Sequence, residues 1–277
     1  MMKLLFFVLF ALPILAKETL LVSILPQKYF IDQIAKDRFE VVALIPKGAS
    51  PATYSLKPSQ LLQIKKAKLY FTIGVPFERA WKDRILGTNP KLRLIDSTKY
   101  IRLYPIGEHE HHKDHVKELL DPHVWLAPNL VEQIARVLLE ELVRLDPAHQ
   151  KEYFENYKAF IAKIAQIDTK IFSMVLHSHT KAFLISHPSL GYFARSYGLK
   201  QLPIEAGGKE PKMARLIHLI QKAKELGIRV IFIEPQFPQK SAQFLAKKLG
   251  AKVTLIDPLA QDWEQNILRI VRAITGG

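Results

Sequence analysis

Short apolar runs alternate with amphipathic segments at both ends of this chain. Apolar runs of strand length, separated by segments with helical periodicity, predict buried β-strands. In the first part of the chain these runs lie at residues 19–26, 39–46, 68–74 and 91–96. In the last part they lie at residues 181–188, 200–206, 230–235 and 252–258. Strands that alternate with helices in this way indicate parallel sheets with helices on both faces.

The middle of the chain has a different pattern. From Pro128 to about His177 the apolar residues follow a helical period, and residues 147–178 contain no glycine and no proline after Pro147. Pro147 suits the first turn of a helix, with Asp146 as its cap. A helix of about thirty residues is about 45 Å long. It would connect two lobes, although a helical hairpin within one domain is an alternative.

The predicted fold class is therefore α/β, with two doubly wound parallel-sheet lobes joined by one long rigid helix. The expected boundaries are an N-terminal lobe at 17–146, the connecting helix at 147–178 and a C-terminal lobe at 179–277. The 277 residues are enough for two lobes with cores of their own.

The first sixteen residues have the pattern of a secretory signal peptide. Lys3 precedes an apolar run from Leu4 to Leu15, and Ala16 precedes a charged residue, so we expect cleavage after Ala16. The run is shorter than the about 20 residues that a spanning helix needs. An uncleaved anchor is the alternative, because Ile14 is larger than the residue preferred at its position. We expect the mature protein in an extracytoplasmic space, most simply a Gram-negative periplasm.

Composition narrows the chemistry. The net charge is +14, from 40 basic and 26 acidic residues, but the basic residues are scattered and form no nucleic-acid-binding motif. We therefore expect no nucleic-acid partner. The chain has no cysteine, which excludes disulfides, thiolate metal sites and cysteine nucleophiles. A transition-metal site must then use His, Asp, Glu or water, which leaves zinc, manganese, iron, nickel and copper(II) open.

Candidate metal ligands lie at the ends of predicted strands. Ligands in open α/β sheets bind beyond the carboxyl ends of the strands. His187, Glu234 and Asp257 each lie at the end of a predicted strand in the second lobe, and His123 precedes a helical segment in the first. Taken singly, such a residue is usually a loop cap or a turn former. Two histidines from different lobes and a carboxylate would together form a closed metal site between the lobes, with ligands that suit zinc or manganese.

Six stretches of the sequence carry a family resemblance. They are "IPKGASPATYSLKPSQ", "DPHVWLAP", "SHPSLGYFARSYGL", "GGKEPKMARL", "VIFIEPQFPQKSAQFLAKKLGAKV" and "IDPLA". In this order and spacing, the chain resembles the zinc/manganese-type (ZnuA- and TroA-like) solute-binding proteins of bacterial ABC importers over nearly its whole mature length. The resemblance implies two α/β lobes, a metal buried between them, an inner-membrane ABC permease as partner and a monomer.

The resemblance also implies a ligand set, with one departure. The positions that match family ligands are His123, His187 and Asp257, and a histidine at the third ligand position favours zinc over manganese. The first family ligand is usually the histidine of a Pro-His-x-Tyr pattern, but this chain has Ala52 there, in "SPATY". Three protein ligands and water still form a sound zinc shell, of a kind typical of catalytic sites. A lower affinity, a substitute ligand and a different metal are all open consequences.

A histidine-rich stretch, "EHEHHKDH", occupies residues 108–115 and ends shortly before His123. Its imidazoles are His109, His111, His112 and His115. We favour an accessory loop that captures metal at secondary affinity. Replacement of the ligand missing at Ala52 and an inert solvated loop are the alternatives. Glu234 either orients a ligand imidazole without binding the metal itself, or caps a helix.

The predicted function is an extracytoplasmic Zn²⁺-binding protein, not an enzyme, that captures the metal and delivers it to an ABC permease. Binding of Mn²⁺ or another divalent metal, metal buffering and surface adhesion are alternatives. A zinc-dependent hydrolase is less favoured, because the chain has no H-E-x-x-H, G-x-S-x-G or P-loop motif. Glu234 would be the single candidate base for such a hydrolase.

Overall fold

The structure is a computed structural model that describes residues 17–106, 120–205 and 209–276. The predicted signal peptide and the histidine-rich stretch lie outside these residues, so the structure does not test either prediction. Among the described helices, none has the length and apolar character that crossing a membrane requires.

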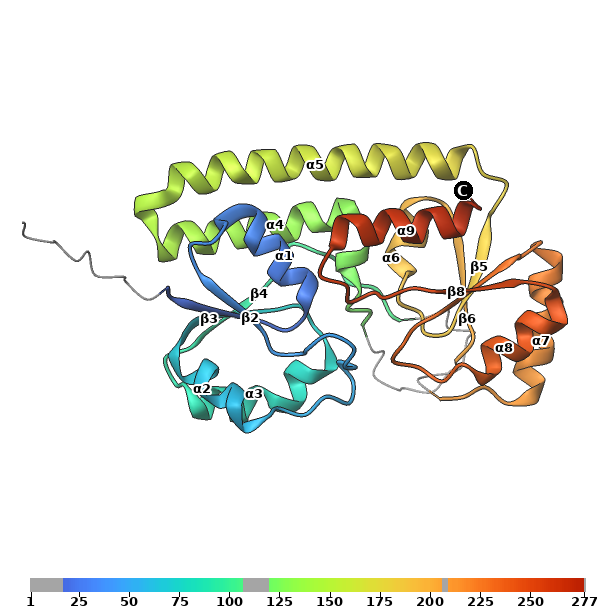
Figure 1. Cartoon of the computed structure of the whole chain (residues 1–277), viewed down its shortest axis with the longest axis horizontal. Coiled ribbons are helices and arrows are strands. Elements are labelled where there is room, and N and C mark those ends of the chain that lie inside the picture. Colours follow the sequence, from blue (N-terminus) through green and yellow to red (C-terminus); the bar gives the residue numbers. More distant parts are fainter. Residues whose placement is uncertain (1–16, 107–119, 206–208, 277) are drawn as a thin grey trace, which may run out of the picture.

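The first lobe is built on a four-stranded parallel sheet with the order β2-β1-β3-β4 (Figure 1). Its strands are β1 (Thr19–Val22), β2 (Glu40–Ala43), β3 (Ala67–Thr72) and β4 (Arg93–Asp96). They are connected by α1 (Leu25–Ala35), α2 (Pro58–Lys66) and α3 (Pro76–Thr88). Each of these helices has a proline in its first turn, where the missing N–H costs no hydrogen bond.

The second lobe repeats this arrangement, with a parallel sheet in the order β6-β5-β7-β8. Its strands are β5 (Ala182–Ile185), β6 (Lys200–Pro203), β7 (Val230–Ile233) and β8 (Lys252–Leu255). Its helices are α6 (Gly191–Ser196), α7 (Met213–Glu225), α8 (Lys240–Leu249) and α9 (Trp263–Thr275). Two parallel-sheet lobes with a long helix confirm the predicted fold class.

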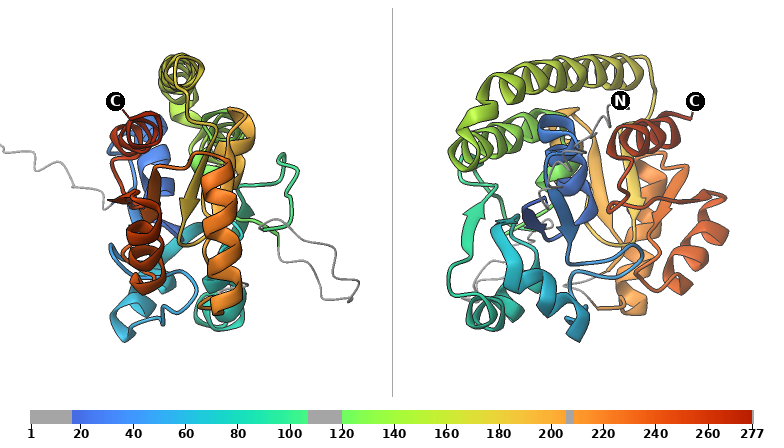
Figure 2. Two further views of the ribbon diagram at one scale, coloured as in Figure 1. Left: turned by 90° about the vertical axis from the view of Figure 1, so that its right-hand side faces the viewer. Right: turned by 60° about the vertical axis from the view of Figure 1, so that its left-hand side comes forward.

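Helices fill the middle of the chain. A short 3-10 turn, η1 (Val124–Leu126), leads into α4 (Pro128–Leu145), and a second turn, η2 (Pro147–His149), leads into the long α5 (Gln150–Leu176). The long helix contacts α4 and α1 near one end and α9 near the other, and it lies along the top of the molecule in Figure 1. The left view of Figure 2 shows it nearly end-on at the top of the molecule. It therefore contacts both lobes.

The start of α5 differs from the prediction. The segment from Pro147 forms a 3-10 turn first, and the α-helix begins at Gln150. Asp146 does not cap the helix through a backbone N–H. Its carboxylate instead lies 2.8 Å from the His149 Nδ1 and accepts a 2.6 Å hydrogen bond from the Tyr153 hydroxyl. Two side-chain partners thus replace the expected backbone partner.

A shared hydrophobic core joins the lobes. One cluster of buried residues includes side chains from both sheets and from α1, α5 and α9. Phe30 of α1 lies with its ring 5.4 Å from Trp263 of α9 and 6.0 Å from Phe160 of α5. A second, smaller cluster lies wholly in the second lobe, between its sheet and the helices α7 and α8. The two lobes therefore share one continuous packed core.

Candidate metal centre

His123 is held at the start of η1 by a carboxylate two residues earlier. Asp121 Oδ1 accepts a hydrogen bond from the backbone N–H of His123 at 2.9 Å and lies 2.6 Å from the Nδ1 of the same residue. A carboxylate is an acceptor, so Nδ1 carries the proton and Nε2 keeps its lone pair. The imidazole packs against the buried Trp125, with ring centroids 5.2 Å apart. These contacts fix the orientation of the ring and leave Nε2 as the nitrogen that can accept a bond.

His187 is held in the same way in the second lobe. It follows β5, and its Nδ1 lies 2.8 Å from Oε1 of Glu205, which follows the neighbouring strand β6. Phe237 stacks on the imidazole, with centroids 4.5 Å apart and an angle of 11° between the rings. The carboxylate and the aromatic ring together fix the orientation of His187 and leave its Nε2 without a hydrogen-bond partner among the described residues.

The structure brings these two histidines together. Their ring centroids are 5.1 Å apart, and the rings make an angle of 69°. Two imidazoles that bind one tetrahedral zinc through Nε2 have centroids about 5 Å apart, given Zn–N distances of about 2.0–2.1 Å. The spacing of the pair thus matches the spacing that a shared metal ion requires.

Glu234 and Asp257 lie at the ends of the next two strands, β7 and β8. Glu234 is fully buried, and its carboxylate accepts a hydrogen bond from the Ser189 hydroxyl. Burial raises the pKa of Glu234 to about 7; nearby His187 lowers this pKa, whereas Glu205 and Asp257 raise it. Glu234 therefore interacts electrostatically with both His187 and Asp257. The carboxylates that are hydrogen-bonded to the two imidazoles, however, are those of Asp121 and Glu205.

Asp257 faces a groove between the lobes. The groove has a volume of about 1180 Å³ and is lined by Pro46 and Lys47 of the first lobe and by Ile256 and Asp257 of the second, among others. Asp257 Oδ1 accepts the backbone N–H of Leu259 at 3.0 Å, and its Oδ2 makes no hydrogen bond within the described residues. One carboxylate oxygen of Asp257 therefore has no hydrogen-bond partner among the described residues.

Ala52 lies in an exposed turn of the loop that follows β2. Its backbone N–H donates to the Ser50 hydroxyl at 3.3 Å, and its methyl side chain offers no donor to a metal. Across residues 17–106, 120–205 and 209–276, no three His, Asp or Glu side chains are gathered closely enough to hold a metal ion. The structure brings His123 and His187 together and leaves Asp257 outside this pair.

Sequence reasoning missed Asp121, Glu205 and Phe237. Glu205 lies near the end of the strand predicted at residues 200–206, so the rule that found His187 would also have found Glu205 if applied there. Asp121 precedes His123 by two residues, a spacing at which Asp often bonds a backbone N–H. Nothing in the sequence links Phe237 to His187, because that contact depends on how the loop after β7 folds back.

Comparisons with known proteins give consistent matches. The family described as "Zinc-uptake complex component A periplasmic" matches residues 20–276. The high-affinity zinc uptake system protein ZnuA of Bacillus subtilis (strain 168) is 30% identical over 244 residues, which cover 84% of this chain and 76% of that protein. A putative metal-binding protein of Chlamydia trachomatis serovar D is 27% identical, covering 98% of this chain and 99% of that protein.

Solved structures of metal-binding proteins have the same fold as this chain. A crystal structure of ZnuA has a TM-score of 0.87 and 36% identity and covers 95% of this chain and 99% of its own. A Mn-bound periplasmic metal binding protein from Candidatus Liberibacter asiaticus has a TM-score of 0.81 and 20% identity over 93% of this chain and 100% of its own, which shows a shared fold. These matches confirm the resemblance predicted from the sequence.

Proposed function

The chain belongs to the family of periplasmic component A proteins of zinc-uptake complexes, and on this premise we propose that it captures Zn²⁺ and delivers it to an ABC permease. The observation that carries the proposal is the pair of imidazoles, His123 and His187, at 5.1 Å between centroids, each with Nδ1 bonded to a carboxylate. Carboxylates bonded to ligand imidazoles are the usual outer partners of a zinc site.

We propose His123, His187 and Asp257 as the protein ligands. Asp257 would approach the pair through its unbonded Oδ2, and water would take the fourth position, since Ala52 has no donor atom. Two nitrogen ligands and one oxygen ligand suit zinc better than manganese, which prefers oxygen. The crystal structure of a ZnuA deletion mutant with zinc bound, 36% identical to this chain, is in line with zinc as the cargo.

The proposed role is binding and transfer rather than catalysis. A hydrolase needs a general base that reaches a metal-bound water. Glu234 is 1% exposed and already accepts the Ser189 hydroxyl, so its carboxylate is enclosed. We further propose that the mature protein begins at Lys17, acts as a monomer in the periplasm and docks on the permease in the inner membrane.

Calorimetric titration with Zn²⁺ tests the ligand set. The chain from Lys17 should bind one zinc tightly, and His187→Ala should abolish this tight binding. His218→Ala is the matched control, because His218 is exposed on α7 and should leave the titration unchanged. A His187→Ala variant that still binds one zinc with native affinity would refute the proposed site.

The histidine-rich stretch is tested by deleting residues 108–115 from the same protein. We propose that the stretch captures metal at secondary affinity, so the deletion should remove weak sites and keep the tight one. If the tight site disappears with the stretch, one of its histidines serves as a primary ligand in place of the one missing at Ala52.

A further inference from the structure

The segment that leads to His123 pairs with an earlier segment of the chain, and we call this paired region the neck. The neck consists of Tyr104, Pro105, Leu120 and Asp121, which form an isolated antiparallel bridge between Pro105 and Leu120. The backbone N–H of Asp121 donates to the Tyr104 carbonyl at 2.7 Å. Asp121 is also the residue whose carboxylate orients His123. The position of the neck therefore determines the position of one proposed metal ligand.

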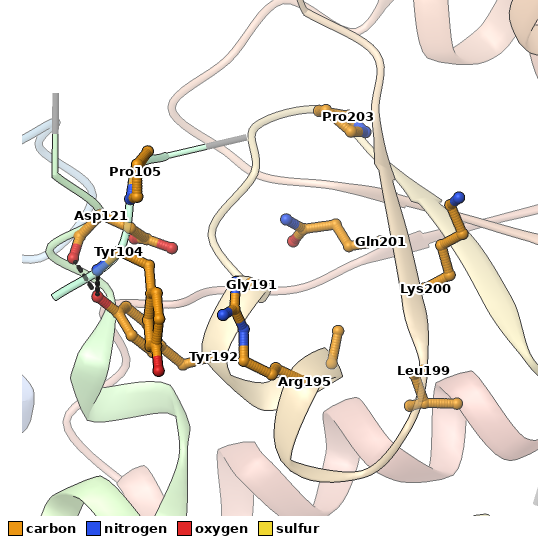
Figure 3. A pocket seen from close by; sticks show the side chains of 11 residues that line it. Tyr104, Pro105, Asp121, Gly191, Tyr192, Arg195, Leu199, Lys200, Gln201 and Pro203 are labelled. Atoms are coloured by element: carbon orange, nitrogen blue, oxygen red, sulfur yellow. Dashed lines mark hydrogen bonds between the residues drawn. The ribbon is translucent and has the colours of Figure 1, made fainter. Parts of the chain in front are cut away.

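Tyr192 of α6 holds both strands of the neck from the other lobe. Its hydroxyl accepts the backbone N–H of Tyr104 at 3.0 Å and donates to the backbone carbonyl of Asp121 at 3.0 Å. Figure 3 shows these two bonds meeting at the Tyr192 oxygen. Burial raises the pKa of Tyr192 to about 12, so the hydroxyl keeps its proton at neutral pH and can make both bonds.

Two other residues of α6 also contact the neck. The guanidinium of Arg195 lies 3.9 Å from the centre of the Tyr104 ring, a cation–π contact. Gly191 lies against the Asp121 carboxylate, and a Cβ added there would come within 2.8 Å of Asp121 Oδ2. Helix α6 therefore contacts both strands of the neck at close range, and the lack of a side chain at Gly191 permits the approach.

Packing alone does not fix the neck on this side. A cavity of about 250 Å³ lies beside it, bounded by Tyr104, Asp121, Arg195 and Gln201 among others (Figure 3). An open cavity lets neighbouring groups shift more easily than a close-packed interior does. The two hydrogen bonds of the Tyr192 hydroxyl are thus a specific restraint on the neck where close packing is missing.

The same short segment of the second lobe carries His187 and Tyr192. His187 follows β5, and Tyr192 lies in α6 directly after it. On the basis of the proposed function, we propose that Tyr192 is a positioning residue of the metal site. Its hydroxyl fixes His123, through Asp121, at the distance from His187 that one metal ion requires.

Two tyrosine-to-phenylalanine variants test this proposal. Tyr192→Phe removes the hydroxyl that bridges the neck. Tyr197→Phe is the matched control, because its hydroxyl, at the end of the same helix, donates to Asp168 of α5 at 2.5 Å and does not touch the neck. Tyr192→Phe should weaken Zn²⁺ binding about tenfold, the lower range for outer-partner mutations. Tyr197→Phe should change the affinity less than twofold.

The visible absorption spectrum of bound Co²⁺ separates positioning from general stability. It reports the arrangement of ligands around the metal, and it should change in Tyr192→Phe and stay native in Tyr197→Phe. Arg195→Met, which removes the guanidinium and its cation–π contact but keeps an unbranched apolar side chain, should weaken zinc binding two- to fivefold. This second variant keeps the proposal testable if Tyr192→Phe folds poorly.

Equal zinc affinities and equal Co²⁺ spectra in Tyr192→Phe and Tyr197→Phe would overturn the positioning role. This result differs from failure of the proposed function, in which the unaltered protein itself would bind no zinc tightly. Thermal unfolding of both metal-free variants completes the comparison, because similar losses of stability with different zinc affinities assign the difference to the metal site.

Discussion

Each imidazole of the candidate site is paired with one carboxylate, and this pairing is testable residue by residue. Asp121→Asn and Glu205→Gln keep the size of the side chain but remove the charge that bonds Nδ1. Loss of such a partner typically lowers metal affinity about 10–100-fold. Competition with a zinc chelator should show this loss for both variants. Asp83→Asn, an exposed change on α3, should leave the affinity native.

If the affinities of both variants equal that of Asp83→Asn, the carboxylates do not support the metal ligands. A loss in one variant alone would restrict the supporting role to that imidazole.

Gly191 provides a second test at the residue scale. Gly191→Ala places a Cβ 2.8 Å from Asp121 Oδ2, which forces this carboxylate to shift relative to His123. We expect zinc affinity to fall several-fold. Gly87→Ala in α3 is the control, because a Cβ there meets nothing within 4 Å. That change should stabilise the helix by about 0.5–1 kcal/mol and leave zinc binding unchanged, as measured by thermal unfolding and calorimetry.

A positional rule applied to the sequence found some of the candidate residues. His187 and Asp257 stand directly after strands, so the topology of the sheet places them at the edge between the lobes. The partners Asp121 and Glu205 were missed because a hydrogen bond between side chains depends on the path of two loops. Tyr192 was missed for the same reason, since its partners Tyr104 and Asp121 are far away in sequence.

At the scale of elements, strands and long helices were predicted well and their ends were not. The apolar run at 19–26 gives a strand only to Val22, because Ser23 and Ile24 lead into α1 while staying buried. Apolar residues thus continue past the end of the strand as the loop enters the core. Helix α6 was not predicted, since its six residues are too few to establish a helical period.

Near the strand ends of the first lobe lies a half-buried carboxylate, Glu78 of α3. Its carboxylate accepts the Ser23 hydroxyl and the backbone N–H groups of Ile73 and Gly74, the last two at 2.8 Å. Burial raises the pKa of Glu78 to about 7; these hydrogen bonds lower this pKa, and the nearby charge of Asp96 raises it. Between pH 4.5 and about 7, Glu78 is therefore largely protonated in the folded protein and largely ionised in the unfolded chain.

This raised pKa predicts how stability depends on pH. The folded pKa is about 7 and the ordinary value is 4.5, so between these values the native state binds more protons than the unfolded state. The free energy of unfolding should fall as pH rises through this window, by at most about 1.4 kcal/mol per pH unit from this group. Glu78→Gln should show a smaller fall in urea unfolding between pH 5 and 7.

Other titrating groups contribute equally to both proteins in this comparison, so the difference between the two slopes isolates Glu78. Tyr70, whose hydroxyl lies 2.7 Å from that of Ser23, stays protonated over this range because burial raises its pKa well above the ordinary value of tyrosine. Parallel slopes in the two proteins would contradict the raised pKa of Glu78.

For the whole molecule, the shared core predicts cooperative unfolding. Phe160 of α5 is 2% exposed and packs on Tyr29 and Phe30 of the first lobe. Phe160→Ala should lower the free energy of unfolding by about 3–5 kcal/mol. Because the cluster continues into the second lobe, hydrogen exchange should speed up together in β3 and β7. Native protection of β7 beside a loss in β3 would show that the lobes unfold separately.

The shared core also affects how empty and zinc-loaded protein compete for the proposed permease. Wide separation of the lobes would expose Phe30, Phe160 and Trp263, and each buried aromatic side chain contributes about 1.5–3 kcal/mol to the packed state. Empty and loaded copies then present nearly the same outline to a receptor. An empty copy would compete for the docking site, and surplus empty protein should slow zinc uptake into permease-containing vesicles. The ratio of protein to available zinc would thus set the rate of import.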